Sequence, residues 1–553
     1  MITEYTLAHL TKLSLISGSL LPYPQMKNKT EKALLIGIIA LCLLYLFLGL
    51  IYKPIICNDA INGMISLHNY IHGGEWNQFL NLSGNGTDVS AHELTWWAPG
   101  QYEIPYLLSK LCSISIGSSI VLLMFASISG GCLFYYKIFK LSSLGNKTIL
   151  LSLLILLLQR FINIYFIQYN SSDLILFFYT PFYIYTYYQL CKTYPQKILL
   201  KIFLLTLLNF TGLFIKNSFV LFELAVNIFL IAEYFFHDKV DNKITPTRSD
   251  TPVYTRLSVL FPFVLANLLN YYFFLRLGTN PAQGDSLLMT LSAIITGIFL
   301  PVMEVLFASL SLSGIYGNFY QKIALSQQIA GMVMMVILMG TGYLLYREKN
   351  GIRNLLGKDA VFRLAMITAV VYVSSWFVFT VKQSAVSGED RLFLPVTILI
   401  IPYLLNHSST TASKIKYVYF AFVGISILYG IGTFAYRIKK YSINGSVWSK
   451  NSRLNGFKIY SDNKDATREL DKVAHIISQN FAKDYIVVSN PDIAFQLDIT
   501  NKFIVNTSTS FSNSSHLKAG IHYMLVVQLG KDTPPMGLNK LYSSNKYSLF
   551  RSN

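Results

Sequence analysis

Residues 33–52 read ALLIGIIALCLLYLFLGLIY, a run in which no side chain carries a charge. About 20 helical residues cross a hydrocarbon layer of about 30 Å, so this run predicts a membrane-spanning helix. The whole chain has 553 residues, of which 53% are hydrophobic and only 13% are charged, whereas soluble proteins carry about 25% charged residues. The composition therefore excludes a water-soluble globular protein and predicts a polytopic membrane protein.

Apolar runs of similar length recur along the chain. Eleven segments are predicted to span the membrane: 33–52, 115–136, 147–168, 174–190, 198–215, 218–236, 257–275, 327–346, 362–381, 392–406 and 415–436. Residues 286–321 are also long enough to cross, but one further crossing would put the later basic loops on the wrong side of the membrane. We therefore expect a re-entrant or interfacial segment there, within an outer region 276–326. Residues 1–31 lack the pattern of a cleavable signal peptide, so the first span is expected to act as an uncleaved insertion signal.

The net charge of +18 lies mostly in short loops between apolar runs, not in a patch of the kind that binds nucleic acid. The basic loops 137–147, 192–201, 239–256 and 347–358 are cytoplasmic by the positive-inside rule. The loop 53–114 holds five acidic residues against two lysines, so we expect it on the outer side and the N-terminus in the cytoplasm. No eukaryotic targeting signal is evident, and we expect a bacterial inner or plasma membrane protein with no nucleic-acid partner.

The composition changes in the last part of the chain. Residues 437–553 contain 16 basic and 8 acidic residues, which is an ordinary proportion for a soluble domain. Apolar residues at helical spacing over 465–483 predict a helix, and short apolar runs predict three strands, at 485–488, 502–505 and 523–528. We expect a small extracytoplasmic α/β domain at 437–553 after a transmembrane module at 1–436. The domain has no phosphate-binding loop, zinc-spaced cysteine set or nucleophile elbow, so it is assigned no chemistry.

The outer loop 53–114 contains two unusual stretches. Residues 58–74 place apolar side chains on one helical face and end in a Gly-Gly pair, which predicts an amphipathic helix lying on the membrane surface. Asp59 falls in the first turn of this helix, where it either faces a cavity at the membrane boundary or caps the helix. Residues 96–102, WWAPGQY, form an aromatic-rich turn whose Pro99 can open the next helix. Alternatively, the Trp and Tyr side chains of this turn anchor it at the membrane interface.

An acidic residue after the first span, a helix ending in Gly-Gly and a Trp-Ala-Pro-Gly-Gln-Tyr turn resemble the first outer loop of the GT-C superfamily. These membrane glycosyltransferases include protein O-mannosyltransferases, aminoarabinose transferases and the catalytic subunit of oligosaccharyltransferase. Three further segments resemble that superfamily. They are an outer loop whose Asp opens the fourth span, a Gly-to-Lys turn between the fifth and sixth spans, and a late outer-loop element: 170–178, 212–217 and 389–395.

The resemblance implies an all-α, GT-C-like fold of about 11 transmembrane helices. It also implies transfer of a sugar, with inversion, from a polyprenyl-phosphate or diphosphate lipid to an extracytoplasmic hydroxyl or amine. Such a transfer needs a base for the acceptor proton and cations for the leaving phosphate. Asp59 is the expected base, and Asp173 is expected to position the acceptor or to orient a cation. Lys216 and Arg391 are expected to hold the donor phosphate.

Further substrate contacts are expected from the outer loops, at His92, Glu93, Trp97, Tyr102, Glu389 and Asp390. Either Glu389 or Asp390 is the equivalent of the superfamily's late acidic residue. Each charged residue also has a simpler role, since Lys216 and Arg391 could reach the lipid headgroups and Asp173 could cap a helix.

The sequence predicts no metal site and no certain cofactor, and a divalent metal is compatible with the proposed chemistry. The expected partners are a polyprenyl-linked sugar donor, a glycan, lipid or protein acceptor, and membrane lipids. Two alternative functions use related substrates: a polysaccharide polymerase or ligase, and a flippase for lipid-linked oligosaccharides. A flippase is expected to show internal repeats, and the sequence shows none.

Overall fold

A computed structural model describes residues 28–276 and 349–551 together with isolated positions between 339 and 347. Within these ranges the segments left undescribed are 53, 57, 83–88, 94–97, 170–171, 194–196, 237–252, 384–392, 411–414, 444–445, 449–457, 461–463, 490, 498, 506–522 and 529–537.

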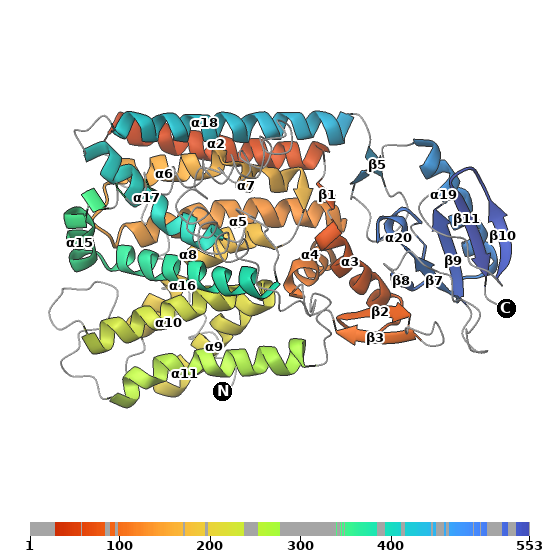
Figure 1. The fold of residues 1–553 in the computed structure, drawn as a ribbon, viewed down its shortest axis with the longest axis horizontal. Coiled ribbons are helices and arrows are strands. Elements are labelled where there is room, and N and C mark those ends of the chain that lie inside the picture. Colours follow the sequence, from red (N-terminus) through yellow and green to blue (C-terminus); the bar gives the residue numbers. More distant parts are fainter. Residues whose placement is uncertain are drawn as a thin grey trace, which may run out of the picture.

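Helices whose axes lie roughly parallel or antiparallel form a bundle, and a small α/β region lies at one end of it (Figure 1). The bundle helices are α2 (Lys29–Tyr52), α5 (Ile116–Phe139), α6 (Asn146–Leu158), α7 (Arg160–Asn163), α8 (Asp173–Thr193), α9 (Ile198–Ile215), α10 (Phe219–Phe236), α11 (Val253–Asn270), α16 (Ala360–Gln383), α17 (Leu394–Thr410) and α18 (Ile415–Arg437). Short helical pieces adjoin them: η1 (Ile164–Phe166), η3 (Tyr271–Leu275), α15 (Lys349–Lys358) and η6 (Ile438–Ile443).

Four of the described helices are long and apolar enough to cross a membrane, namely α2, α5, α9 and the Ala360–Val378 part of α16. Helices also occupy six more of the eleven predicted spans. The predicted span 327–346 lies almost entirely outside the described residues, and the segment 286–321 lies wholly outside them. The number of spans therefore stays a prediction, while the apolar helices fit a protein associated with a membrane.

Several bundle helices expose large apolar side chains on one face and bury side chains on the other. On α2, Tyr45 is buried, whereas Ile36, Leu43 and Phe47 are exposed. An exposed apolar face of this kind suits a lipid environment better than water, because exposing apolar surface to water is unfavourable.

The predicted third span, 147–168, differs from a single helix. The helix α6 ends at Leu158, and the backbone of Gln159 is extended before α7 begins. Gly430 of α18 packs its backbone against this break, and the hydroxyl of Ser426 donates a hydrogen bond of 2.6 Å to Oε1 of Gln159. The segment holds neither Gly nor Pro, so its sequence alone does not reveal the break.

The outer loop folds into α3 (Asn58–Ile71), the hairpin of β2 (Gln78–Leu82) and β3 (Val89–Glu93), and α4 (Gly100–Cys112). The prediction that α3 lies on the membrane surface is wrong. Apart from the partly exposed Asn62, every residue from Ala60 to Asn69 is buried, because α3 packs between α4 and the later helix α20 (Pro491–Leu497). A periodic apolar pattern shows that a helix is covered but does not show by what, and α20 lies more than 400 residues along the chain.

The five-stranded sheet of the C-terminal region has strands where the apolar runs predicted them, and two further strands. Its sheet has the order β10 (Asn539–Ser543), β11 (Tyr547–Arg551), β9 (Tyr523–Gln528), β7 (Tyr485–Val488) and β8 (Phe503–Val505). The strand β7 runs parallel to both β8 and β9. The helix α19 (Lys464–Asn480) buries Leu470, Val473 and Ile477, the apolar face that predicted it.

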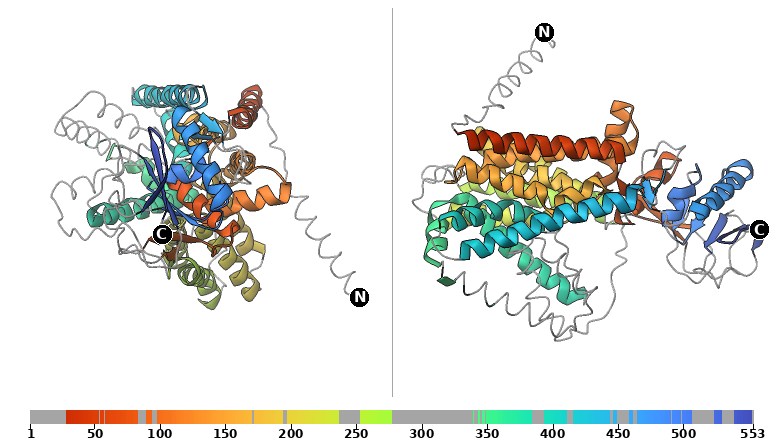
Figure 2. Two further views of the ribbon diagram at one scale, coloured as in Figure 1. Left: turned by 90° about the vertical axis from the view of Figure 1, so that its right-hand side faces the viewer. Right: turned by 90° about the horizontal axis from the view of Figure 1, so that it is seen from above.

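A second small sheet joins this region to the bundle, in the order β4 (Gln168–Tyr169), β1 (Ile55–Ile56), β6 (Lys458–Tyr460) and β5 (Ser446–Trp448). Ile55 in the middle of this sheet pairs with both Gln168 and Lys458. Views from two further directions show the C-terminal region at the same end of the bundle as the outer loop (Figure 2). The end of the bundle that carries the candidate site is therefore capped by sheet and helix.

Candidate functional site

Two predicted site residues, Asp173 and Lys216, meet in an ion pair beneath this cap. Asp173 is the first residue of α8, and Lys216 directly follows α9. The Lys216 ammonium pairs with Oδ1 of Asp173, whose side chain is 0% exposed, while the Lys216 side chain is 16% exposed. The hydroxyl of Tyr165 donates a hydrogen bond of 2.8 Å to the other carboxylate oxygen. An acid, an amine and a phenol thus form one nearly buried cluster.

The local chain geometry explains why these charges are tolerated. A carboxylate is favoured in the first turn of a helix, and a cation is favoured next to the last carbonyl groups of one. Asp173 and Lys216 occupy these two positions. The hydroxyl of Ser172 also donates a hydrogen bond of 2.5 Å to the carbonyl of Ile215. This bond satisfies one free carbonyl at the end of α9 and ties the start of α8 to it.

The aromatic turn of the outer loop reaches the same place. A Cβ atom at Gly100 would lie 2.5 Å from the carbonyl oxygen of Phe214 and 2.9 Å from Cα of Ile215. Only a glycine therefore lets the start of α4 lie against the last turn of α9, which Lys216 follows. The hydroxyl of Tyr169 adds a hydrogen bond to the carbonyl of Gln101. Three of the four segments that resemble the GT-C superfamily are in this way brought together.

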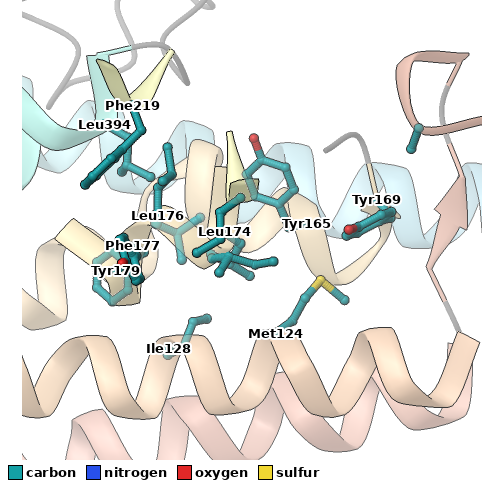
Figure 3. Close-up of a cluster of buried hydrophobic side chains, with 14 of the residues drawn as sticks. Met124, Ile128, Tyr165, Tyr169, Leu174, Leu176, Phe177, Tyr179, Phe219 and Leu394 are labelled. Atoms are coloured by element: carbon teal, nitrogen blue, oxygen red, sulfur yellow. The ribbon is translucent and has the colours of Figure 1, made fainter. Parts of the chain in front are cut away.

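A cluster of buried apolar side chains includes residues close to the ion pair (Figure 3). It includes Tyr165, Leu174 next to Asp173, and Phe219 three residues after Lys216. Leu394 of α17 belongs to the same cluster, which brings the end of the fourth segment to this core. Apolar surroundings lower the local dielectric constant and strengthen the attraction between the two charges.

The remaining predicted residues are less fully described. Asp59 is the second residue of α3, in its first turn as predicted, and His92 and Glu93 end β3. Tyr102 is buried on α4, and its hydroxyl donates a hydrogen bond to Oδ1 of Asn77. Burial raises the pKa of Tyr102 well above its ordinary value, so the phenol is a neutral donor. Four predicted residues lie outside the described part of the chain: Trp97, Glu389, Asp390 and Arg391.

Sequence reasoning missed two groups at this end of the molecule. One is Tyr165, which lay inside a predicted span and carried no signal of its bond to Asp173. The other is Glu103, which had been counted only as a charge of the outer loop. Its carboxylate accepts a hydrogen bond of 2.8 Å from Nε1 of Trp76. Burial raises the pKa of Glu103, and the bond from Trp76 and the charge of Lys110 lower it in part.

Within the described residues, no group of three or more His, Cys, Asp and Glu side chains is arranged to hold a metal ion. His68 and His72 are four residues apart, and the centroids of their rings lie 4.4 Å apart. Nε2 of His68 is 2.9 Å from the carbonyl oxygen of Asn501. His68 thus bonds to the C-terminal region.

No protein-family model matches the sequence, and no curated protein matches it. Among solved structures, the chain is similar to the apo form of an oligosaccharyltransferase from Archaeoglobus fulgidus. The two share 10% sequence identity over 90% of this chain and 69% of the other, with a TM-score of 0.39. No residue role follows from a likeness at this level. The fold and site define a bundle with several membrane-length apolar helices and a buried ion pair under an α/β cap.

Proposed function

We propose that this protein is a membrane glycosyltransferase. It moves a sugar from a polyprenyl-phosphate or diphosphate donor to a hydroxyl or amine of an extracytoplasmic glycan, lipid or protein. The observation that carries the proposal is the cluster of Asp173, Lys216 and Tyr165, placed under the cap at the ends of α8 and α9.

The cluster suits the leaving phosphate of such a donor. An ammonium group has three N–H donors, and the Lys216 side chain keeps 16% of its surface exposed. The exposed part of the Lys216 side chain is available to a phosphate oxygen. Tyr165 keeps Asp173 oriented, so the ammonium is fixed before the substrate arrives. A fixed charge aimed at an oxygen where charge develops stabilises the transition state more than the ground state.

The proton of the acceptor needs a separate base, and Asp59 is the proposed one. Its carboxylate takes the hydroxyl proton as the acceptor oxygen bonds to the anomeric carbon and the bond from that carbon to the phosphate breaks. The phosphate leaves on its lipid, held by Lys216 and, in this proposal, by Arg391. Attack from the face opposite the phosphate inverts the anomeric configuration.

A transfer assay with purified protein in lipid nanodiscs tests the proposal. Radiolabelled polyprenyl-phosphate sugars are offered with a membrane fraction that supplies acceptors. We expect Lys216→Gln to lower the transfer rate about 100-fold or more, as removal of one transition-state donor does elsewhere. Lys110→Gln, a matched change at an exposed lysine of α4, should leave the rate unchanged.

Two further outcomes would change the proposed base or the proposed class of protein. Equal rates for the wild type and Asp59→Asn would remove Asp59 as the base. Movement of the labelled donor between leaflets without any transfer would instead establish a flippase.

A further inference from the structure

Three buried amide atoms on residues around Tyr102 lack a hydrogen-bond partner among the residues that the structure describes. They are Nδ2 of Asn77, Nε2 of Gln101 and Oδ1 of Asn62. Asn77 and Gln101 are each only 2% exposed. Buried amide groups in native proteins are nearly always paired, so each unpaired one calls for an explanation.

The three groups lie around one contact between α3, α4 and the turn before β2. The ring of Tyr102 comes within 2.5 Å, and Nε2 of Gln101 within 3.1 Å, of the point where Gly63 would carry a Cβ atom. The Tyr102 hydroxyl bonds to Asn77, which places the Asn77 amide at the far end of the same ring.

Asn62 belongs to this contact through Ser66. The hydroxyl of Ser66 donates a hydrogen bond of 2.8 Å to the carbonyl of Gln78, next to Asn77. Asn62 lies one helical turn before Ser66 and therefore on the same side of α3.

The unpaired groups define the chemistry that would complete them. Nδ2 of Asn77 and Nε2 of Gln101 donate, whereas Oδ1 of Asn62 accepts. An anion would satisfy only the two donors, but a hydroxyl group accepts and donates at once. Trp76 precedes Asn77 and is 38% exposed, and its indole N–H is held by Glu103. A partly exposed indole beside hydroxyl-binding groups suits a sugar ring, which has both apolar faces and hydroxyl edges.

We propose that Asn62, Asn77 and Gln101 form a subsite for the hydroxyl groups of a sugar, with Trp76 as its aromatic wall. The subsite adjoins the ion pair, because Gly100, the neighbour of Gln101, packs against the end of α9 just before Lys216. That this sugar takes part in transfer rests on the proposed function, whereas its binding does not.

Ligand-observed saturation-transfer NMR on the full chain in nanodiscs tests the subsite directly. The probes are methyl glycosides of mannose, galactose and N-acetylglucosamine at millimolar concentration, without any lipid donor. We expect saturation transfer from the wild type to at least one probe. Gln101→Met should weaken the binding of that probe about tenfold, which is the effect of one lost hydrogen bond.

Two controls separate recognition from folding. Gln78→Met makes the same chemical change at an amide that bonds to the exposed Glu75, and it should bind the probe as the wild type does. Gln101→Met should also unfold at no lower temperature than the wild type, because it removes an unpaired buried amide.

The proposal is overturned if no probe receives saturation from the wild type, which would mean that water alone fills the contact. Equal binding by the wild type and Gln101→Met would overturn it as well. A wild type that binds a probe but transfers no sugar from any lipid donor would refute the proposed function and leave the subsite in place.

Discussion

The ion pair of Asp173 and Lys216 shows how single residues carry this site. Each charge is costly to bury by itself, and their mutual attraction offsets the cost only while both are present. Tyr165 and the two helix ends add the remaining polar contacts. Stability and the proposed sugar transfer therefore make different demands on the same two side chains, and variants can separate them.

Lys216→Gln alone should lower the free energy of unfolding by about 3–5 kcal/mol, because it leaves the buried Asp173 charge without its counterion. The double variant Asp173→Asn with Lys216→Gln should recover most of that loss, since two neutral amides can bond to each other and to Tyr165. Sugar transfer should stay lost in both variants. Denaturant unfolding in detergent measures the first effect, and a double variant no more stable than Lys216→Gln would contradict the interpretation.

Glu103 gives a pH dependence with a definite sign. Burial raises the pKa of its carboxyl in the folded protein above the ordinary value of about 4.5, so the folded state holds the proton more tightly than the unfolded state does. Its contribution to stability is complete below that ordinary value and is lost as the pH rises through the raised pKa. We expect the unfolding temperature of the wild type to fall over this range relative to Glu103→Gln. An equal change of unfolding temperature with pH in the two proteins would contradict a raised pKa of Glu103 in the folded state.

At the scale of elements, α3 is fixed from both sides. Its side toward α4 contacts Tyr102. Near its C-terminal end, Asn69 forms hydrogen bonds with the C-terminal region. The Asn69 amide donates to the carbonyl of Phe503 at 2.9 Å and accepts from the Phe503 N–H at 2.8 Å. One side chain thus pairs with the edge strand β8 in the way a neighbouring strand would. The helix that carries Asp59 is in this way fixed by the C-terminal region.

Asn69→Leu should therefore release the edge of β8. It keeps the size of the side chain but leaves two buried backbone groups unpaired, at a cost of about 1–3 kcal/mol each. Hydrogen exchange followed by mass spectrometry should show faster exchange in peptides that cover α3 and Phe503. Tyr70→Leu, at the exposed neighbour of Asn69, is the matched control and should exchange as the wild type does. Unchanged exchange in Asn69→Leu would mean that the C-terminal region does not fix α3.

The elements also show how far sequence reasoning reached. Apolar periodicity located helices at ten of the predicted spans and the helix and strands of the C-terminal region, because that pattern is local. It failed where the deciding partner is remote. The break at Gln159 depends on Gly430, and the cover of α3 depends on α20. The candidate site followed the same rule. The sequence predicted Asp173, as a residue that positions the acceptor or orients a cation, and Lys216, but the pairing of these two residues and the bond from Tyr165 appeared only in three dimensions.

The whole molecule has two different ends. At the capped end lies the cluster of Asp173 and Lys216. Toward the other end, Arg363 of α16 forms a two-point ion pair with Glu233 of α10, at 2.5 and 3.0 Å. Nη1 of Arg363 also donates a hydrogen bond of 2.8 Å to the carbonyl of Leu356 in α15. Helix α15 lies at the end of the bundle opposite the C-terminal region (Figure 1). The charge distribution of the sequence predicts that the capped end faces out of the cell and the end with α15 faces the cytoplasm.

Cysteine labelling in intact cells tests this orientation. In a background with Cys57→Ser and Cys112→Ser, Ser478→Cys on α19 and Lys358→Cys on α15 each place a thiol at an exposed position. A membrane-impermeant maleimide should label the first and should label the second only after the cells are opened. Labelling of Lys358→Cys in intact cells would reverse the orientation and would place the proposed site on the cytoplasmic side.

The central claim is that Lys216, held by Asp173, stabilises the phosphate that leaves a lipid-linked sugar. Its most direct test is the rate of sugar transfer from a polyprenyl-phosphate donor by the purified protein in nanodiscs, for the wild type, Lys216→Gln and Lys110→Gln. We predict transfer by the wild type and by Lys110→Gln, and a loss of about 100-fold or more in Lys216→Gln. Transfer by Lys216→Gln at the wild-type rate would contradict the claim.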